Sequence, residues 1–445
     1  MTPGRTLLLR AYDAGDTYVS FRWLDDSENP VVHRIPAQSR DRALGALAKA
    51  LVEVPDEQGD DDAALEAAVR EAVTGPFTRR VGELGLSATL SALLLPKSVC
   101  QQLLSPSSCR VLVRITPSRM LARVPFELLP VDDSTRLIEV ADLCYEPPAA
   151  VHVGRSRLPE PWSATTAARP VTYLIDPQLP AGSGLGPTLP RGAAAAGNTN
   201  ARVFKDRLAT RSTTRSSGVG KVCGRWDLSD DLNEVPGRLV YFGHVTADPG
   251  EPGSASLHLS DDARVWGVTQ AINKVHRPLS ALDLLLGTAR AELNASESEL
   301  EAEVGWGPEL WPMPPRVAII ACEGGVDFRT SETFGLVMAI FNAGAEVVTT
   351  TRWTLPSDNG FHKYAGVDSV PGPTTELALA VDTTHEYTDP VRALGDWQRQ
   401  KLQEWMAAPG PATSPLVWAA AACHTCPPRE VVSPRLAGTE KGQSA

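Results

Sequence analysis

The sequence has 445 residues, a formal net charge of −11 at pH 7, 42% hydrophobic residues and 21% charged residues. This length exceeds one ordinary domain, and the composition is typical of a globular protein with a large core. The acidic balance argues against non-specific nucleic-acid binding, which needs a basic surface, and no apolar run approaches the roughly 18 residues of a membrane-spanning helix. Seven cysteines at irregular spacing indicate reduced thiols in a cytoplasmic protein and no disulfide framework.

Residues 1–95 are predicted to form a separate N-terminal α+β lobe. Segments 6–12 and 17–23 are expected to be strands, and the second of them alternates polar and apolar side chains. Two amphipathic helices are expected to follow. The acidic stretch between them, 56–62, lacks the alternating spacing of a calcium loop, so we expect a solvated loop and no metal site there.

Two glycine-rich stretches in the second part of the chain resemble nucleotide-binding loops without meeting their requirements. In residues 180–187 the third glycine comes one place too early for a dinucleotide fingerprint, and the required helix does not follow. Residues 218–221 end in Gly-Lys, but Val222 stands where a serine or threonine should hold magnesium. A nucleotide-binding function is therefore a poor interpretation.

The most informative stretch is the apolar run Val317–Ala321, which ends at Cys322 and is followed by a glycine pair. Such a run is typical of a strand buried on both faces of a parallel sheet. A helix over 333–344 and a second strand over 345–351 complete a predicted βαβ unit, in which loops at the carboxyl ends of strands carry chemistry. Cys322 is placed at such an end.

His244 ends another apolar run, 237–243. If the two strands are neighbours, the thiol and the imidazole meet, and the imidazole can raise the thiolate population and later protonate a leaving amine. Backbone N–H groups at Cys322 and after His244 would hold the developing oxyanion. Taken alone, such a cysteine is more often a small core residue and such a histidine a satisfied one. Their occurrence in one pattern favours the functional interpretation.

Six segments carry motifs in a fixed order along the chain: 115–129, ending in Val-Pro-Phe-Glu-Leu-Leu; 240–244, Val-Tyr-Phe-Gly-His; 256–259, Ser-Leu-His-Leu; 320–324, Ile-Ala-Cys-Glu-Gly; 332–345, with Gly-Leu and Ala-Gly-Ala; and 414–420, Ser-Pro-Leu-Val-Trp-Ala-Ala. Together they resemble the CHAT-domain proteins, bacterial caspase-like peptidases of the clan that includes caspases and separase. The resemblance extends from about Pro96 to about Cys423, and we expect one such domain over 96–426.

The resemblance implies a fold and an activity. The fold would be a caspase-like three-layer α/β/α sandwich around a mostly parallel sheet. The activity would be that of a cysteine endopeptidase, a hydrolase that needs no metal and no organic cofactor. Its residues would be Cys322 as nucleophile, His244 as general base and acid, the backbone amides of Cys322 and Val245 as oxyanion donors, and Arg119, Arg123, Arg352 and Trp353 as candidates for the substrate pocket.

The sequence departs from the family pattern in three places. Val245 stands where the family has glycine after the histidine. The segment from about 267 to 314 is longer than usual, so we expect an inserted helical piece, helical from 279 to 304, that overhangs the cleft. The turn that begins at Trp353 reaches its acid, Asp358, late. These departures keep a rival hypothesis open, that of a catalytically inactive caspase-like scaffold that binds protein partners.

Family members often act in bacterial conflict or immunity systems, beside helical repeats that sense a trigger. This chain has no internal repeat, so we expect a separate regulatory or sensor protein as a partner, in addition to a protein substrate. We expect neither nucleic acid nor membrane as a partner. Residues 427–445 are expected to form a disordered tail, and the Cys423–Cys426 pair is expected to be structural.

Overall fold

The computed structural model describes residues 5–53, 61–105, 109–148, 151, 154–189, 199–247, 251, 253–290, 304–322 and 335–426. The predicted tail over 427–445, most of the acidic stretch 56–62 and the glycine pair after Cys322 lie outside these ranges. Within them, no helix is both long enough and apolar enough to cross a membrane.

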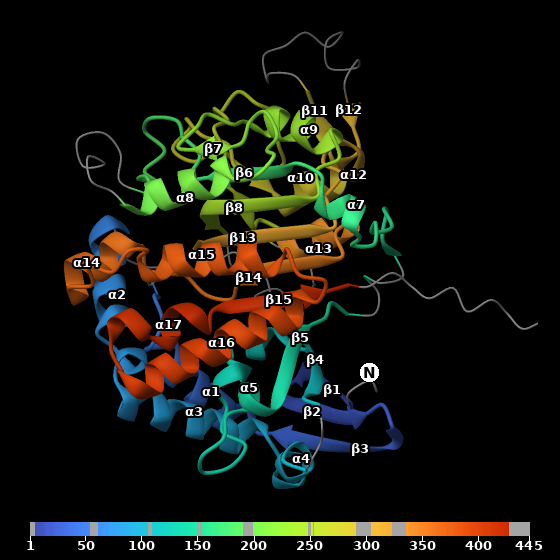
Figure 1. Ribbon diagram of the computed structural model, residues 1–445, viewed down its shortest axis with the longest axis vertical. Coiled ribbons are helices and arrows are strands. Elements are labelled where there is room, and N and C mark those ends of the chain that lie inside the picture. The colour runs from blue at the N-terminus through green and yellow to red at the C-terminus, as the bar shows by residue number, and fades with distance from the viewer. Residues whose placement is uncertain are drawn as a thin grey trace, which may run out of the picture.

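One sheet of 13 strands organises the molecule. In order across the sheet, its main path is β10 (Leu279–Ser280), β9 (Ser256–Leu257), β8 (Arg238–Thr246), β13 (Arg316–Cys322), β14 (Val347–Thr351), β15 (Ala421–Thr425), β5 (Ala141–Tyr145), β4 (Val111–Thr116), β1 (Thr6–Ala14), β2 (Asp16–Trp23) and β3 (Asp26–Ile35). Off this path, β6 (Val171–Ile175) pairs with β8, and β7 (Gly218–Val219) pairs with β6. A separate hairpin joins β11 (Thr288–Ala289) to β12 (Val304–Gly305). Figure 1 shows the sheet running from β7 and β6 near the top to the blue N-terminal strands near the bottom.

Most neighbouring strands run parallel, but the direction reverses once near the middle of the sheet. The strands β6, β8, β13 and β14 are mutually parallel. β15 is antiparallel to β14, and β5, β4 and β1 follow the direction of β15. The carboxyl ends of β8 and β13 therefore lie at the opposite edge of the sheet from the carboxyl end of β4.

Helices cover the sheet. They are α1 (Ala37–Ala48), α2 (Asp61–Val73), α3 (Arg80–Leu94), α4 (Lys97–Leu103), α5 (Leu137–Val140), α7 (Ala164–Ala167), α8 (Thr199–Ala209), α9 (Arg225–Asn233), α10 (Ala281–Leu286), α12 (Gly307–Leu310), α13 (Leu336–Asn342), α14 (Asp358–Ala365), α15 (Pro373–Thr384), α16 (Pro390–Ala407) and α17 (Pro415–Trp418). Short 3₁₀ helices occur at η1 (Pro76–Thr78), η2 (Arg119–Leu121), η3 (Phe126–Leu128) and η6 (Pro411–Thr413).

Two hydrophobic cores lie on the two faces of β8 and β13. Side chains alternate between the faces of a strand, and the even-numbered residues Val240, Phe242, Ala318 and Ile320 belong to the first core, together with residues of α8, α15 and α16. The odd-numbered Leu239, Tyr241, Val317 and Ile319 belong to the second core, with residues of α9, α10 and α13. The fold is thus α/β, with a mostly parallel sheet flanked by helices, as predicted (Figure 1).

The N-terminal region contributes the last three strands of this sheet. β1 pairs in parallel with β4, with Leu7 opposite Val113, and β2 and β3 extend the edge as an antiparallel meander. Residues of α1 and α3 belong to the same first core as these strands. The expected strands and helices of residues 1–95 are present and share one sheet with the remainder, and a domain boundary at residue 96 stays a prediction.

The segment from 267 to 314 differs from the predicted long helix. α10 ends at Leu286, and Gly287 follows with a φ of 89°. A Cβ atom at Gly287 would lie 1.9 Å from the carbonyl oxygen of Gly305, so the close pairing of β11 with β12 requires glycine. Trp311 is fully buried, stacks on Trp226 and donates a hydrogen bond to the Arg225 carbonyl. Trp311 is therefore part of the second core, together with Leu279, Ala281 and Leu284. A helix through residue 304 is wrong, because α10 ends at Leu286.

Candidate functional site

β8 and β13 are neighbouring parallel strands, and their register brings the two candidate catalytic positions together. The pairing joins seven residues of each strand and ends with Cys322 opposite His244. Both residues stand at carboxyl ends of parallel strands, and the prediction that the two strands are neighbours is confirmed. The alternation that places Ala318, Ile320, Val240 and Phe242 in the first core puts positions 322 and 244 on that same face. The side chain of Cys322 and the loop after it lie outside the described residues.

The imidazole of His244 is half-buried and held by a backbone carbonyl. Its Nε2 atom lies 2.7 Å from the carbonyl oxygen of Gly186 and 3.5 Å from the Thr188 hydroxyl. A carbonyl oxygen only accepts, so Nε2 must carry the proton. In the neutral ring Nδ1 is then left with its lone pair, which is the form that a general base needs.

Asp176 holds the loop that carries Gly186. It follows β6 directly, is 3% exposed, and has a left-handed backbone with a φ of 49°. Its carboxylate accepts hydrogen bonds from the N–H groups of Thr188 (2.8 Å) and Leu189 (3.2 Å), and its own N–H donates to the Phe242 carbonyl. These bonds close the loop over 177–189 and bring its carbonyl against His244.

The same loop encloses a hollow of about 430 Å³, lined by Pro177 and residues 179–187 and without a charged side chain. This loop contains one of the two stretches that fail as nucleotide-binding motifs. The sequence did not reveal its contact with His244. The only available signal was an aspartate placed directly after a buried strand, at the same edge as His244.

The peptide N–H of Val245 faces the β13 side of β8. The carbonyl of Phe242 accepts from Asp176 and the carbonyl of His244 accepts from His258, both on the side where β6 and β9 pair with β8. The N–H of Val245 belongs to the same trans peptide group as the His244 carbonyl, so it points the opposite way, toward the end of β13. The Val245 side chain is 1% exposed and packs in the second core, and its Cβ therefore does not occupy the face that carries His244.

Two of the four candidate pocket residues are core residues instead. Arg352 is 3% exposed and donates to both carboxylate oxygens of Glu127 (2.7 and 2.9 Å) and to two backbone carbonyls. Trp353 is fully buried, stacks on Phe77 and donates to the Leu416 carbonyl. These contacts within the chain argue against a pocket role for Arg352 and Trp353, which stays an untested prediction.

The other two candidates follow β4. Through the successive strand pairings, Ile115 of β4 is level with Leu239, at the opposite end of β8 from His244. Arg119 is exposed and lies three residues beyond the carboxyl end of β4. It is therefore near the end of the strands opposite to the end that carries His244. Arg123 forms an ion pair with Glu53. A substrate-binding role for Arg123 stays a prediction, and the strand order argues against one for Arg119.

Several other cysteines are shielded from reaction. Burial raises the pKa of the Cys100, Cys144 and Cys223 thiols, and it raises the pKa of Cys423 to about 12 and that of Cys426 to about 11. At neutral pH these five are protonated thiols, and the thiolate is the nucleophilic form. Across the described residues, no group of three or more histidine, cysteine or acidic side chains is placed to hold a metal ion.

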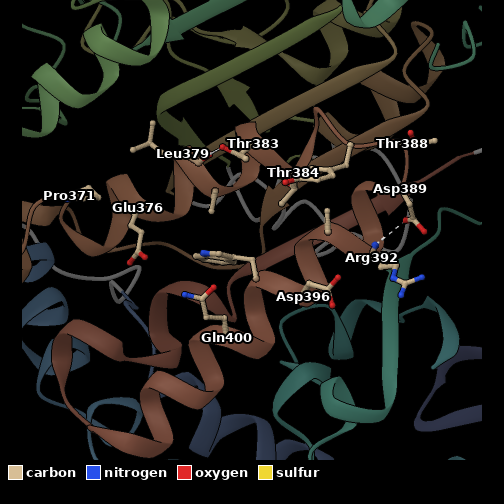
Figure 2. A pocket seen from close by; sticks show the side chains of 14 residues that line it. Pro371, Glu376, Leu379, Thr383, Thr384, Thr388, Asp389, Arg392, Asp396 and Gln400 are labelled. Carbon is tan, nitrogen blue, oxygen red and sulfur yellow. Dashed lines mark hydrogen bonds between the residues drawn. The ribbon is translucent and has the colours of Figure 1, made fainter. Parts of the chain in front are cut away.

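A groove with a volume of about 810 Å³ lies between α15 and α16 (Figure 2). Leu379 and Trp397 contribute apolar surface to it, and Asp389 accepts from the Arg392 backbone N–H at the start of α16. Neither His244 nor its neighbours in the loop over 177–189 line this groove. It is therefore separate from the strand ends that carry His244 and Cys322.

No protein-family model matches the sequence, and no curated protein matches it. Among solved structures, the chain is similar to a chain of the Saccharomyces cerevisiae separase–securin complex, with a TM-score of 0.44 and 9% sequence identity. The similarity covers 94% of this chain and 30% of that chain, so this protein spans less than a third of the length of its neighbour.

Proposed function

We propose that the chain is a cysteine endopeptidase of the caspase-like CHAT type, with Cys322 as nucleophile and His244 as general base and acid. The observation that carries this proposal is the register of β8 and β13, which pairs the two residues at the carboxyl ends of adjacent parallel strands. Neighbouring strands are about 4.8 Å apart, a spacing that lets a thiol and an imidazole on one face meet. The ordered motifs that resemble CHAT-domain proteins add to this support.

The contacts of His244 suit the first step of the reaction. Because Gly186 holds the proton on Nε2, Nδ1 would take the thiol proton of Cys322. The thiolate would then attack the carbonyl carbon of the scissile peptide, and the π electrons of that carbonyl would move onto its oxygen. The imidazolium would give its proton to the leaving amine as the C–N bond breaks, which leaves a thioester on Cys322. A water deprotonated by His244 would hydrolyse this thioester and regenerate the thiol.

Two backbone donors would stabilise the tetrahedral intermediate. The N–H of Val245 faces the β13 side, next to the position of Cys322, and the N–H of Cys322 would be the second donor. The valine that replaces the family's glycine does not remove this donor, because its side chain packs in the second core. The packing of Val245 thus supports the active enzyme over the inactive scaffold at this position.

The substrate of this activity would be a protein. A separate regulatory or sensor protein would control it in the cytoplasm, in a bacterial conflict or immunity system, as the CHAT resemblance implies. Trp311, in the segment from 267 to 314, is fixed in the second core, so control of the site would not act through Trp311.

A peptide carrying an acyloxymethyl ketone tests the assignment without knowledge of the substrate. Wild-type protein should form one covalent adduct, which peptide mass mapping should place on Cys322. Cys322→Ala should form none, and His244→Ala should react at least about 100-fold more slowly, the size of a general-base contribution. If Cys322 stays unlabelled in folded wild-type protein, the inactive scaffold is the better description.

A further inference from the structure

Thr246 at the carboxyl end of β8 begins a chain of hydrogen-bonded side chains that continues through His258 to His276. The Thr246 hydroxyl is 2.8 Å from Nε2 of His258, and Nδ1 of His258 is 3.0 Å from Nε2 of His276. Nδ1 of His276 is 2.8 Å from the carbonyl oxygen of Asp261. Both histidine side chains are fully buried, and the reaction proposed for Cys322 and His244 uses neither of them.

The donor and acceptor in each of these hydrogen bonds follow from the groups at the His276 end. The Asp261 carbonyl can only accept, so Nδ1 of His276 carries a proton, and Nε2 of the neutral ring must accept. Nδ1 of His258 therefore donates to it, and Nε2 of His258 is left as an acceptor. The hydrogen of the Thr246 hydroxyl is then committed to His258, which fixes the rotamer of Thr246.

Both rings are held in the neutral form that this direction needs. Burial lowers the pKa of His258 well below its usual value, with smaller contributions from His276 and from His244, whose ring lies edge-on at 6.4 Å. Burial also lowers the pKa of His276, against the hydrogen bond to Asp261, and the nearby Arg225 guanidinium lowers it further. Protonation of His276 would place its Nε2–H directly against the Nδ1–H of His258.

The far end of the chain is anchored in a rigid part of the second core. The carboxylate of Asp261 accepts from the backbone N–H of Arg225 at 3.0 Å. The Arg225 side chain is fully buried and donates to the backbone carbonyls of Trp266, Arg277 and Pro278. The acceptor at the end of the histidine chain is thus held by backbone contacts on several sides.

At the other end of this hydrogen-bonded chain, two further contacts hold the backbone of His244. The N–H of His258 donates to the His244 carbonyl at 3.1 Å, and the Tyr241 hydroxyl lies 2.6 Å from that same carbonyl. β9 pairs with β8 through Val245 and Thr246. His258 therefore restrains the peptide groups on both sides of Val245. Its backbone N–H holds the His244 carbonyl, and its ring holds the hydroxyl of Thr246.

We infer that His258 and His276 are positioning residues, which act through Thr246 to fix the backbone of residues 244–246 and the direction of the Val245 N–H. This inference rests on the function proposed for Cys322 and His244. In that reaction the Val245 N–H binds the oxyanion, so its direction affects the rate of bond formation at Cys322 more than the binding of substrate. Neither histidine touches the reacting atoms.

Two substitutions of Thr246 test the inference as a matched pair. Thr246→Val keeps the branched shape and suits a strand but leaves His258 Nε2 without a donor, whereas Thr246→Ser keeps the hydroxyl. The test measures the maximal rate of Cys322 acylation by the ketone probe and the probe concentration at half that rate. We expect Thr246→Val to lower the maximal rate about 10-fold, less than the loss of a whole oxyanion donor, with little change in the half-saturating concentration. Thr246→Ser should stay within about threefold of wild type. Equal rates for the two variants would overturn the inference.

A second measurement does not depend on activity. Hydrogen exchange of the Val245 amide should accelerate in Thr246→Val and remain near the wild-type rate in Thr246→Ser. Nitrogen NMR of the side chains should place the proton on Nδ1 of both His258 and His276 in wild type. If wild-type protein does not react with the probe, the proposed function fails, and these two measurements still decide whether the histidine chain positions the backbone. An unchanged Val245 exchange rate in Thr246→Val, or a proton on Nε2 of either ring, contradicts the inference.

Discussion

The Nε2 atom of His244 donates a hydrogen bond to the carbonyl oxygen of Gly186 at 2.7 Å. This contact decides which ring nitrogen is free to act as a base, and a backbone atom of the loop over 177–189 makes it. The loop is held in turn by Asp176, so the geometry of the proposed dyad depends on a residue outside the dyad.

Asp176 should therefore be sensitive to substitution in a graded way. Asp176→Ala removes the acceptor for Thr188 and Leu189 and places alanine at a φ of 49°, which costs about 1–2 kcal/mol for an ordinary L-residue. Asp176→Asn keeps one acceptor oxygen and tolerates the left-handed backbone better. We expect the alanine variant to lose more than about 10-fold in probe reactivity at Cys322 and the asparagine variant to lose less. Equal reactivity of the two variants would show that the loop does not orient His244.

A methyl group at Gly243 should disturb the carbonyl of His244. A Cβ atom there would lie 2.8 Å from the Tyr241 hydroxyl and 3.3 Å from Cδ of Pro177. We expect Gly243→Ala to lower the free energy of unfolding by about 1–3 kcal/mol, as for other overpacked core sites. Tyr241→Phe removes the crowded oxygen, so the double variant should lose less than the sum of the single losses in a urea-unfolding cycle. Strict additivity would rule out this contact as the cause.

The burial of Arg352 predicts a loss of stability where the sequence suggested a role in substrate recognition. Arg352→Met leaves the buried Glu127 carboxylate without its partner, and breaking a buried pair in this way costs about 3–5 kcal/mol. Arg352→Met combined with Glu127→Gln should recover part of that loss. Urea unfolding measures both. A stable Arg352→Met protein with altered preference among peptide probes would restore the pocket role.

Neutral buried histidines should make the protein sensitive to acid. Burial lowers the pKa of His258, His276 and His385, and it lowers that of His424 to about 3. A histidine whose pKa is lower when folded than when unfolded binds protons more strongly in the unfolded chain, so stability is complete above about pH 6.5 and falls below it. For His424 the fall continues down to about pH 3, by at most about 1.4 kcal/mol per pH unit. We expect the free energy of unfolding to decrease from pH 6.5 to pH 5, and His424→Leu should have a shallower slope than wild type. A flat stability between these pH values would contradict the prediction.

The sequence predicted the strands of the site well, because short apolar runs that end in a reactive side chain are local patterns. Val317–Ala321 and the run before His244 are β13 and β8, and their adjacency followed from the order of motifs. The pairing of β1 with β4 was not predictable in the same way. It joins residues more than a hundred positions apart, and nothing in either strand specifies its partner.

Three features of the structure were not predicted, for related physical reasons. Arg352 follows a strand and has a charged side chain, which from sequence alone reads as exposed, because the carboxylate that compensates it is Glu127 in a distant segment. The contact between Gly186 and His244 is made by a backbone atom, which has no residue-type signature. The hydrogen bond between His258 and His276 has no local sequence signature, since it depends on how β9 and the segment before β10 fold back on β8.

The most direct test of the dyad measures the thiol of Cys322 and requires neither substrate nor activating partner. The rate of Cys322 alkylation by iodoacetamide would be followed against pH by mass mapping, in wild type and in His244→Gln. If the imidazole holds the thiolate, the wild-type rate should reach its half-maximum well below about pH 8.5, the ordinary value for a free thiol, and His244→Gln should move the midpoint up to that value or beyond it. Superimposable profiles for the two proteins, with the midpoint at or above that value in both, would contradict the account.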